Sequence, residues 1–115
     1  IDGTGVRDYI HVCDLAEGHV RALEQLHGKP GSHCFNLGTG SGVSVLEIVN
    51  AYAKVSGRPI PYQIAPRRPG DVAQCYADAS HAKAVLGWQA TRTLEDMVKD
   101  SWRWQSSNPN GYREA

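Results

Sequence analysis

The stretch that decides the fold reads CFNLGTGSGVSVLE and covers residues 34–47. A short apolar segment leads into a glycine-rich loop, and the loop leads into the start of a helix. Ser44 and Glu47 have the spacing of a capping box, in which each side chain satisfies a backbone N–H group of the first turn. We therefore predict a strand over 34–37 and a helix over about 45–55, the repeating unit of an α/β protein.

The same alternation continues on both sides of this stretch. Extended segments are predicted over 6–12, where β-forming residues concentrate, and over 60–65, where apolar and polar residues alternate. Helix starts are predicted at Asp14, just after Asp78, and at Thr93, which caps a helix reaching about residue 106. The pattern predicts an α/β fold with few short, parallel strands and about four helices.

Apolar residues at helical spacing predict which face of each helix is buried. In the first helix this face includes a half-buried histidine, His19. The predicted inward residues are Leu15, His19, Ala22, Leu23 and Leu26 in the first helix, Val45, Ile48, Val49 and Tyr52 in the second, and Leu94, Met97, Val98, Trp102 and Trp104 in the last.

Length and composition exclude several classes of protein. The chain has 115 residues, the size of one domain, and its 12 basic residues balance 12 acidic ones. A nucleic-acid or acidic-membrane binder would be basic, and no apolar run reaches the roughly 18 residues of a membrane-spanning helix. The scattered cysteines Cys13, Cys34 and Cys75 favour a reducing compartment, so we expect a cytoplasmic protein.

Two features indicate a piece of a longer protein. The chain starts at Ile1 rather than at an initiator methionine. A sheet of only three strands would also leave apolar helix faces uncovered. We therefore expect further chain to complete the fold.

The glycine loop has two interpretations. A strand, glycines at positions 38, 40 and 42, and a helix are the setting of a dinucleotide site, where glycines let a phosphate approach a helix N-terminus. The Gly-x-Gly-x-x-Gly pattern, however, needs glycine where Val43 stands, and no acidic residue ends the next predicted strand. The spacing favours a plain strand-to-helix turn.

Arginines provide a second candidate site. Arg68 lies in a loop stiffened by proline and glycine, and Arg7 lies in an extended segment. Because guanidinium groups bind phosphate in a bidentate manner, the two side chains could clamp a diphosphate. The alternative is that both are solvated surface residues and that Arg68 forms only a local ion pair with Asp71.

A catalytic centre or metal site is not predicted within the chain. The five histidines and three cysteines lack zinc-ligand spacing, and no Gly-x-Ser-x-Gly nucleophile motif is present. No tyrosine has a lysine four residues later, the arrangement that lowers a tyrosine pKa for general-base work.

Read in order, six segments resemble the UDP-glucose 4-epimerase family of extended short-chain dehydrogenases. They are GTGVRDYIHV (3–12), NLG (36–38), APRRPGD (65–71), ADAS (77–80), TRTL (91–94) and WRWQSSNPNG (102–111). The resemblance implies that residues 1–115 are the C-terminal UDP-sugar-binding portion of a Rossmann-type fold. It places the NAD-binding Rossmann portion outside this chain.

The resemblance also implies a function. The family interconverts UDP-glucose and UDP-galactose in galactose metabolism, through a 4-keto intermediate and with tightly held NAD. Its Tyr-x-x-x-Lys pair and its NAD-binding turn have no counterpart here. We therefore expect no catalytic residue in this chain, no NAD binding by it and no activity of it alone, and we expect the full-length enzyme to be a homodimer.

Six residues match substrate-binding positions of the family. Arg7 and Arg68 match its phosphate-clamping arginines, and Tyr9 and Asp71 match residues that line the nucleotide. Val45 matches an apolar contact near the uridine. Cys75 stands where some members carry a bulky tyrosine against the sugar, so its small side chain predicts that N-acetylated UDP-sugars also fit.

Two other functions remain open from the sequence. The chain could be a stand-alone UDP-binding module without catalysis, which the presence or absence of an upstream Tyr-x-x-x-Lys pair would decide. It could also belong to a related nucleotide-sugar dehydratase or decarboxylase, although the segment 7–12 argues against that.

Overall fold

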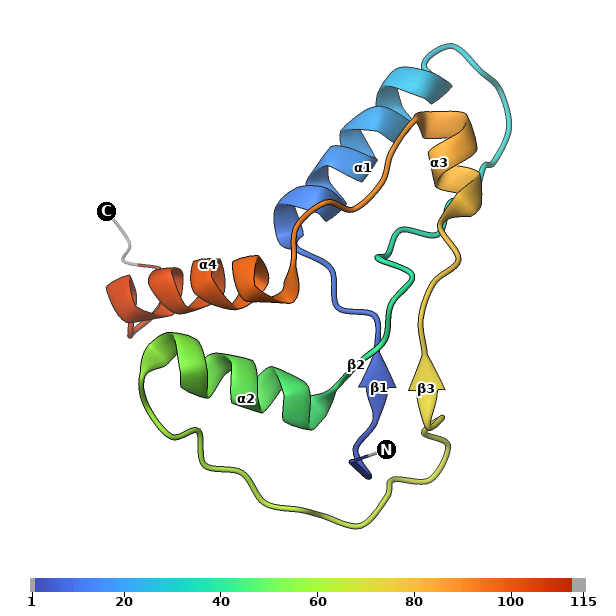
Figure 1. The fold of residues 1–115 in the computed structure, drawn as a ribbon. Helices are drawn as coiled ribbons and strands as arrows, with labels where there is room; N and C mark the ends of the chain where they lie inside the picture. Colours follow the sequence, from blue (N-terminus) through green and yellow to red (C-terminus); the bar gives the residue numbers. More distant parts are fainter. Residues whose placement is uncertain (1, 113–115) are drawn as a thin grey trace.

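The computed structural model describes residues 2–112, in which four helices lie beyond one end and to one side of a small sheet of three strands (Figure 1). The predicted α/β class is confirmed. The elements in chain order are β1 (Val6–Arg7), α1 (Val12–Leu26), β2 (Val43–Ser44), α2 (Val45–Ser56), β3 (Gln74–Cys75), α3 (Ser80–Leu86) and α4 (Leu94–Ser107).

The sheet is mixed, with the order β2-β1-β3. β1 runs parallel to β3 but antiparallel to β2, so the expectation of parallel strands is wrong for one of the two pairs. The reason lies in the loop before β2. Its residues Thr39 and Gly40 are hydrogen-bonded to Asp8, just beyond the C-terminal end of β1. The chain therefore enters β2 from that end and must run back along β1.

The predicted strands over 34–37 and 60–65 do not form. Residues 34–37 have no ladder partner among the described residues, yet Phe35 and Leu37 pack against the buried cluster of Ala82, Leu86 and Trp88. Residues 60–65 lie in the long connection from α2 to β3 (Figure 1), and their side chains are mostly exposed. Alternating β-forming residues are not sufficient where no neighbouring strand supplies the hydrogen bonds.

The N-cap of the first helix lies three residues earlier than predicted, at His11 instead of Asp14. His11 is its N-cap, because Nδ1 of the imidazole accepts a hydrogen bond from the backbone N–H of Cys13 at 3.0 Å. The other ring nitrogen, Nε2, therefore carries the proton of the neutral ring and lies 3.1 Å from Oδ2 of Asp100, on α4. Asp14 is not the cap, because it lies within the first turn of α1. Its carboxylate is fully buried and accepts hydrogen bonds from the backbone N–H groups of Thr91 and Arg92.

This position of Asp14 rotates the buried face of α1 away from the predicted one. The buried residues of α1 are Asp14 and Gly18, while Leu23 is 74% exposed and His19 is also exposed. The half-buried core histidine predicted at position 19 is therefore wrong. On the observed face, Asp14 is bonded to Arg92, 78 residues further along the chain, a partner that helical spacing alone does not reveal.

The predicted capping box of Ser44 and Glu47 is present, and Thr93, predicted as a cap alone, also forms a capping box. The Ser44 hydroxyl accepts a hydrogen bond from the N–H of Glu47, and the Glu47 carboxylate accepts one from the N–H of Ser44. Thr93 and Asp96 make the same reciprocal pair at the start of α4. Gly57 ends α2 with a φ of 65°, a left-handed conformation that favours glycine. The starts of α2 and α4 and the end of α2 are therefore set by local sequence.

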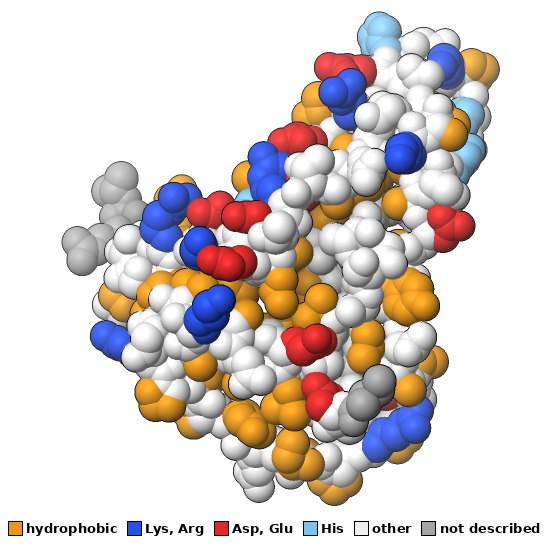
Figure 2. All heavy atoms as spheres, viewed as in Figure 1, with side chains coloured by type: hydrophobic (Ala, Val, Ile, Leu, Met, Phe, Trp, Pro, Cys, Tyr) orange, Lys and Arg blue, Asp and Glu red, His pale blue; other side chains and the backbone are white. Residues whose placement is uncertain are grey.

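α2 and α4 pack against each other, and Val98 of α4 is buried. The hydroxyl of Tyr52, on α2, donates a hydrogen bond to Oγ of Ser101, on α4, at 2.7 Å. Two residues predicted to face inward do not. Val45 is 44% exposed and Trp104 is 47% exposed. Hydrophobic side chains consequently gather on the surface around these helices and along the connection to β3 (Figure 2).

Among residues 2–112, the helices are either too short or too polar to cross a lipid bilayer.

Candidate functional site

The central strand β1 brings two of the predicted binding residues together. Arg7 lies opposite Val43 of β2 on one side and opposite Cys75 of β3 on the other. Cys75 is an exposed free cysteine. Arg7 and Cys75, predicted to contact the diphosphate and the sugar, are thus direct neighbours on parallel strands (Figure 1).

Two further elements reach the N-terminal end of the same strand. Val45, the first residue of α2, donates its backbone N–H to the carbonyl oxygen of Gly5 at 3.2 Å. The loop 66–71 leads into β3, and just before that strand the carbonyl oxygen of Ala73 accepts a hydrogen bond from the N–H of Val6 at 3.0 Å. Val45 and the loop therefore flank the N-terminal end of β1 from opposite sides.

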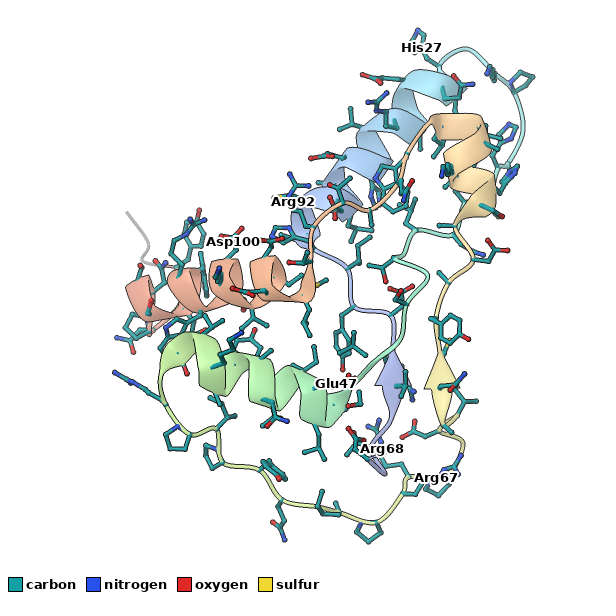
Figure 3. All side chains as sticks on the ribbon, viewed as in Figure 1. His27, Glu47, Arg67, Arg68, Arg92 and Asp100 are labelled. Carbon is teal, nitrogen blue, oxygen red and sulfur yellow. The ribbon has the colours of Figure 1, made fainter. Side chains whose placement is uncertain are left out.

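The loop presents its two arginines to solvent. Nε of Arg68 lies 3.0 Å from Oδ2 of Asp71, and the Arg68 side chain is 82% exposed. Arg67 donates to the backbone oxygen of Asp71 at 2.5 Å instead, and both arginines lie at the β3 end of the connection (Figure 3). An exposed ion pair contributes at most about 1 kcal/mol. The contact between Arg68 and Asp71 therefore leaves the guanidinium available to an anionic ligand.

Arg7 is more confined than Arg68. Its side chain is half-buried, and its Nη1 donates to the carbonyl oxygen of Val6 at 2.7 Å. A Cβ at position 5 would lie 3.5 Å from the same nitrogen, so the guanidinium rests over Gly5. This conformation directs the positive charge toward the N-terminal end of β1, where the loop 66–71 also ends.

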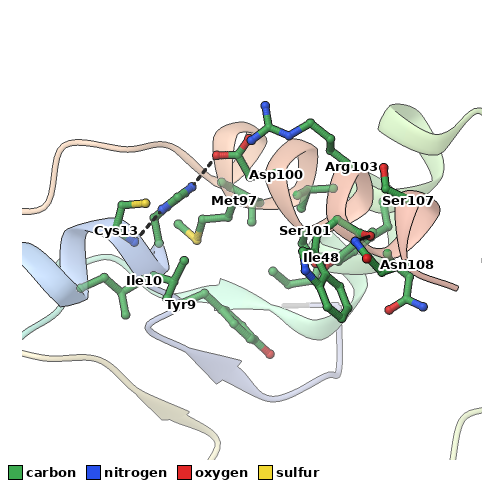
Figure 4. Close-up of a pocket in the computed structure, with 17 residues that line it drawn as sticks. Tyr9, Ile10, Cys13, Ile48, Met97, Asp100, Ser101, Arg103, Ser107 and Asn108 are labelled. Carbon is green, nitrogen blue, oxygen red and sulfur yellow. Dashed lines mark hydrogen bonds and ion pairs between the residues drawn. The ribbon is translucent and has the colours of Figure 1, made fainter. Parts of the chain in front are cut away.

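Tyr9 lies apart from the other five predicted residues. It lines a groove of about 1000 Å³ between the start of α1, α2 and α4 (Figure 4). Its neighbours in the lining include Ile48 and Tyr52 of α2 and Trp104 of α4. The role of Tyr9 at the nucleotide stays a prediction.

The glycines of the loop before β2 serve close packing. A Cβ at Gly38 would lie 2.5 Å from Oδ2 of Asp8 and 2.7 Å from Cβ of Ala77, and one at Gly42 would collide with Cγ1 of Val6. The loop can therefore approach β1 only because these positions lack side chains.

This packing does not fit a dinucleotide. Glycines 38 and 42 already contact protein atoms, and the helix N-terminus beyond them is occupied by the capping residues Ser44 and Glu47. The Ser44 hydroxyl also donates to the Asp2 carboxylate at 2.5 Å, which lowers the pKa of Asp2 to about 2. An acidic side chain thus already lies where a dinucleotide would place its phosphates, so we derive no step of the chemistry from NAD bound here.

Asp8 is the residue that sequence reasoning missed. Its Oδ1 accepts hydrogen bonds from the N–H of Thr39 at 2.9 Å and from the Thr39 hydroxyl at 2.6 Å. Its Oδ2 accepts from the N–H of Gly40 at 3.0 Å and from the N–H of Ala77 at 3.1 Å. We call Asp8 with Thr39, Gly40 and Ala77 the Asp8 junction. The only sequence signal was an acidic residue between two candidate ligands, Arg7 and Tyr9.

The hydrogen bonds at this junction keep Asp8 ionised. Desolvation is the largest single influence and raises the pKa of Asp8, but the donors from Thr39, Ala77 and Gly40 together outweigh it. The net pKa lies below its usual value. Asp8 is therefore an acceptor of four hydrogen bonds and has no role as a proton donor near neutral pH.

No three His, Cys, Asp or Glu side chains within residues 2–112 converge as ligands of a metal ion.

Comparisons with known proteins identify the family. Residues 2–101 match the family model described as GDP-mannose 4,6 dehydratase. The chain belongs to this family. The resemblance of the six sequence segments to the UDP-glucose 4-epimerase family is confirmed by relatives of that name that are 59–64% identical to the chain.

Within the family, the chain is similar to epimerases. It is 64% identical over 114 residues to a UDP-glucose 4-epimerase from Bacillus subtilis, covering 99% of this chain and 34% of that protein. The chain spans about a third of the length of the curated relatives it matches.

Solved structures give the same result. The crystal structure of UDP-glucose 4-epimerase from Bifidobacterium longum in complex with NAD+ and UDP superposes with a TM-score of 0.91 at 59% identity, covering 96% of this chain and 33% of that one. The UDP-Glc/GlcNAc 4-epimerase from Campylobacter jejuni superposes with a TM-score of 0.79 at 39% identity, covering 92% and 32%. The fold of the chain matches the C-terminal part of such structures, as predicted.

Proposed function

We propose that residues 1–115 form the C-terminal UDP-sugar-binding portion of a UDP-glucose 4-epimerase. The full-length protein would interconvert UDP-glucose and UDP-galactose through a 4-keto intermediate, with NAD held by an N-terminal Rossmann portion outside this chain. The observation that carries the proposal is the 64% identity over nearly the whole chain to a protein of that activity. The superposition on an epimerase structure that contains UDP supports it independently.

In this proposal the two arginines bind the diphosphate. Arg7 projects its charge along the N-terminal end of β1, and Arg68 is freely accessible in the loop that ends there. Two guanidinium groups from segments 61 positions apart can contact the two phosphates with charge-assisted hydrogen bonds. Phosphate oxygens would displace Asp71 from Arg68, which costs little because that ion pair is exposed.

The other proposed ligands surround this clamp. Asp71, released from Arg68, is suited to accept hydrogen bonds from ribose hydroxyls, and exposed Val45 offers an apolar surface to the uracil ring. Cys75, beside Arg7, would lie against the sugar. Tyr9 is proposed to line the nucleotide from the side of the α2–α4 groove.

Binding through the nucleotide suits an epimerase. A firm hold on UDP anchors the substrate at a distance from the reacting carbon, so the sugar ring itself can stay free to turn. This chain would then supply binding energy and orientation, while the catalytic tyrosine and the cofactor lie outside it. We accordingly propose that residues 1–115 alone are inactive and bind no NAD.

The test is a turnover assay of the full-length protein with UDP-galactose. Epimerase activity predicts an equilibrium mixture of UDP-glucose and UDP-galactose that is reached from either side. A dehydratase would instead release water irreversibly and yield a keto-deoxy sugar, and a stand-alone binding module would leave both substrates unchanged. Either of these results would overturn the proposal.

We further propose that the full-length protein is a cytoplasmic homodimer. The scattered, exposed cysteines suit a reducing compartment, and light scattering of the full-length protein would measure its mass in solution. A monomeric mass would contradict the dimer.

A further inference from the structure

We propose that Asp8 is a positioning residue of the UDP site, which sets the place of the diphosphate clamp without contacting the ligand. This inference rests on the proposed function. It starts from the size of the sheet. Each strand contributes only two residues to the ladders, Val6–Arg7 against Val43–Ser44 and against Gln74–Cys75. Ladders this short hold neighbouring segments weakly, so another interaction must fix them around Arg7.

The Asp8 junction provides that interaction. The Asp8 carboxylate directly follows Arg7 and accepts hydrogen bonds from both flanking segments at once, at Thr39 and Gly40 on one side and at Ala77 on the other. Its partners lie 31, 32 and 69 residues away in sequence. One side chain therefore joins three parts of the chain that carry or adjoin proposed ligands.

Each of the two carboxylate oxygens has its own pair of donors. Oδ1 accepts both donors of Thr39, whereas Oδ2 accepts the backbone N–H groups of Gly40 and Ala77. Gly38 closes over the junction, since any Cβ there would lie 2.5 Å from Oδ2. The four hydrogen bonds thus use the acceptor capacity of the Asp8 carboxylate with protein donors, which distinguishes a positioning role from direct ligand binding.

The consequence for the clamp follows from the register. Cys75, two residues before Ala77, is the partner of Arg7 on β3, and Val43, three residues after Gly40, is its partner on β2. Loss of the junction would release β3 and the loop before β2 from β1. The fixed relative positions of the proposed ligands would then be lost, namely those of Arg7, Cys75 and the loop 66–71.

The test compares two aspartates that make the same kind of contacts in different places. Asp8→Asn keeps the size of the side chain, but an amide offers oxygen to only one donor pair and turns its NH2 against the other. Asp14→Asn is the matched control, because Asp14 also accepts backbone N–H bonds, from Thr91 and Arg92, and carries no proposed ligand. Both variants are made in the full-length protein and titrated calorimetrically with UDP.

We expect Asp8→Asn to raise the Kd for UDP at least about tenfold, since displacement of Arg7 weakens a charge-assisted phosphate contact. The KM for UDP-galactose should rise with it while kcat changes less, the mark of weakened uniform binding. Asp14→Asn should lower the Tm and leave the Kd for UDP within about twofold. An unchanged Kd in folded Asp8→Asn, or an equal rise in both variants, would overturn the inference.

A second pair of variants covers the case in which Asp8→Asn does not fold. Thr39→Val removes one donor of the junction, and Thr39→Ser retains the hydroxyl. UDP binding should weaken in Thr39→Val and recover in Thr39→Ser, whereas equal Kd values would overturn the inference. If the wild-type full-length protein does not bind UDP, the proposed function itself fails, and that result is distinct from any difference between variants.

Discussion

The completely buried carboxylate of Asp14 forms an ion pair with the guanidinium of Arg92, whose side chain is 34% exposed. The same carboxylate accepts backbone N–H bonds from Thr91 and Arg92, and the carbonyl oxygen of Asp14 accepts the indole N–H of Trp88 at 2.9 Å. The segment between α3 and α4 is thereby fixed to the first turn of α1. Asp14 is also the buried residue of α1 with the most hydrogen bonds to this segment among the described residues.

The ion pair predicts a large loss of stability on removal of its acid. Asp14→Ala leaves Nη1 of Arg92 and the backbone N–H groups of Thr91 and Arg92 without their acceptor, so the free energy of unfolding should fall by about 3 kcal/mol. The matched control is Glu17→Gln, since Glu17 also binds Arg92 at 3.0 Å but is 57% exposed. That change should cost less than about 1 kcal/mol. Urea unfolding of the protein measures both, and equal losses would contradict the account.

Close packing of the loop before β2 predicts that Gly42 cannot carry a side chain. Gly42→Ala would force a methyl group against Val6, and overpacking of this kind typically costs about 1–3 kcal/mol. Gly5→Ala is the control, because its nearest contact would be an ordinary 3.5 Å. Thermal unfolding should show a lower Tm for the first variant alone. A Tm for Gly42→Ala that equals the wild type would mean that the loop does not pack as described.

Acid should destabilise the protein through its aspartates. The Ser44 hydroxyl, as the largest influence, lowers the pKa of Asp2 to about 2 from its ordinary 3.8, and the net pKa values of Asp8 and Asp14 are also lowered. A lowered folded-state pKa contributes stability above the unfolded-state pKa, and that stability is lost as the pH falls through the folded value. The Tm should therefore fall between about pH 4 and pH 2.

A pH series of thermal unfolding curves checks this. Asp14→Asn removes one of the lowered groups, so its Tm should depend less steeply on pH over the same interval. A wild-type Tm that stays constant or rises from pH 5 to about pH 2.5 would contradict the assignment of these ionised carboxylates.

Features encoded by neighbouring residues could be predicted from the sequence. The starts of α2 and α4 were correct, because a capping box needs only Ser44 with Glu47, or Thr93 with Asp96. The end of α2 at Gly57 was equally local. Such contacts span three residues, so no knowledge of the fold is required.

Features that depend on distant partners could not be predicted. Asp14 has the sequence of a helix cap, but its partner Arg92 lies 78 residues away, and His11 takes the cap instead. The strand predictions over 34–37 and 60–65 were wrong for the same reason, because a strand forms only where a neighbouring strand supplies hydrogen bonds. At the candidate site Arg7 and Arg68 were candidates from residue chemistry alone, and the other four ligands came from the resemblance. Asp8 was missed because its donors lie 31 to 69 residues away.

The small side chain at position 75 predicts a broader substrate range. Cys75 is exposed on β3 beside Arg7, where a tyrosine would fill the space proposed for the sugar. Cys75→Tyr in the full-length protein should abolish turnover of UDP-N-acetylglucosamine and retain turnover of UDP-glucose. Cys75→Ser serves as the control and should keep both. If Cys75→Tyr left the N-acetyl activity unchanged, position 75 would not determine sugar size.

The most direct measurement of the central claim, that this chain holds UDP, is a calorimetric titration of the full-length protein with UDP. The wild type is compared with Arg68→Ala and with Arg67→Ala, its neighbour in the same exposed loop. We predict that Arg68→Ala weakens UDP binding at least about tenfold, the loss of a charge-assisted phosphate contact, and that Arg67→Ala binds like the wild type. Equal affinities of the wild type and Arg68→Ala would contradict the proposed diphosphate clamp.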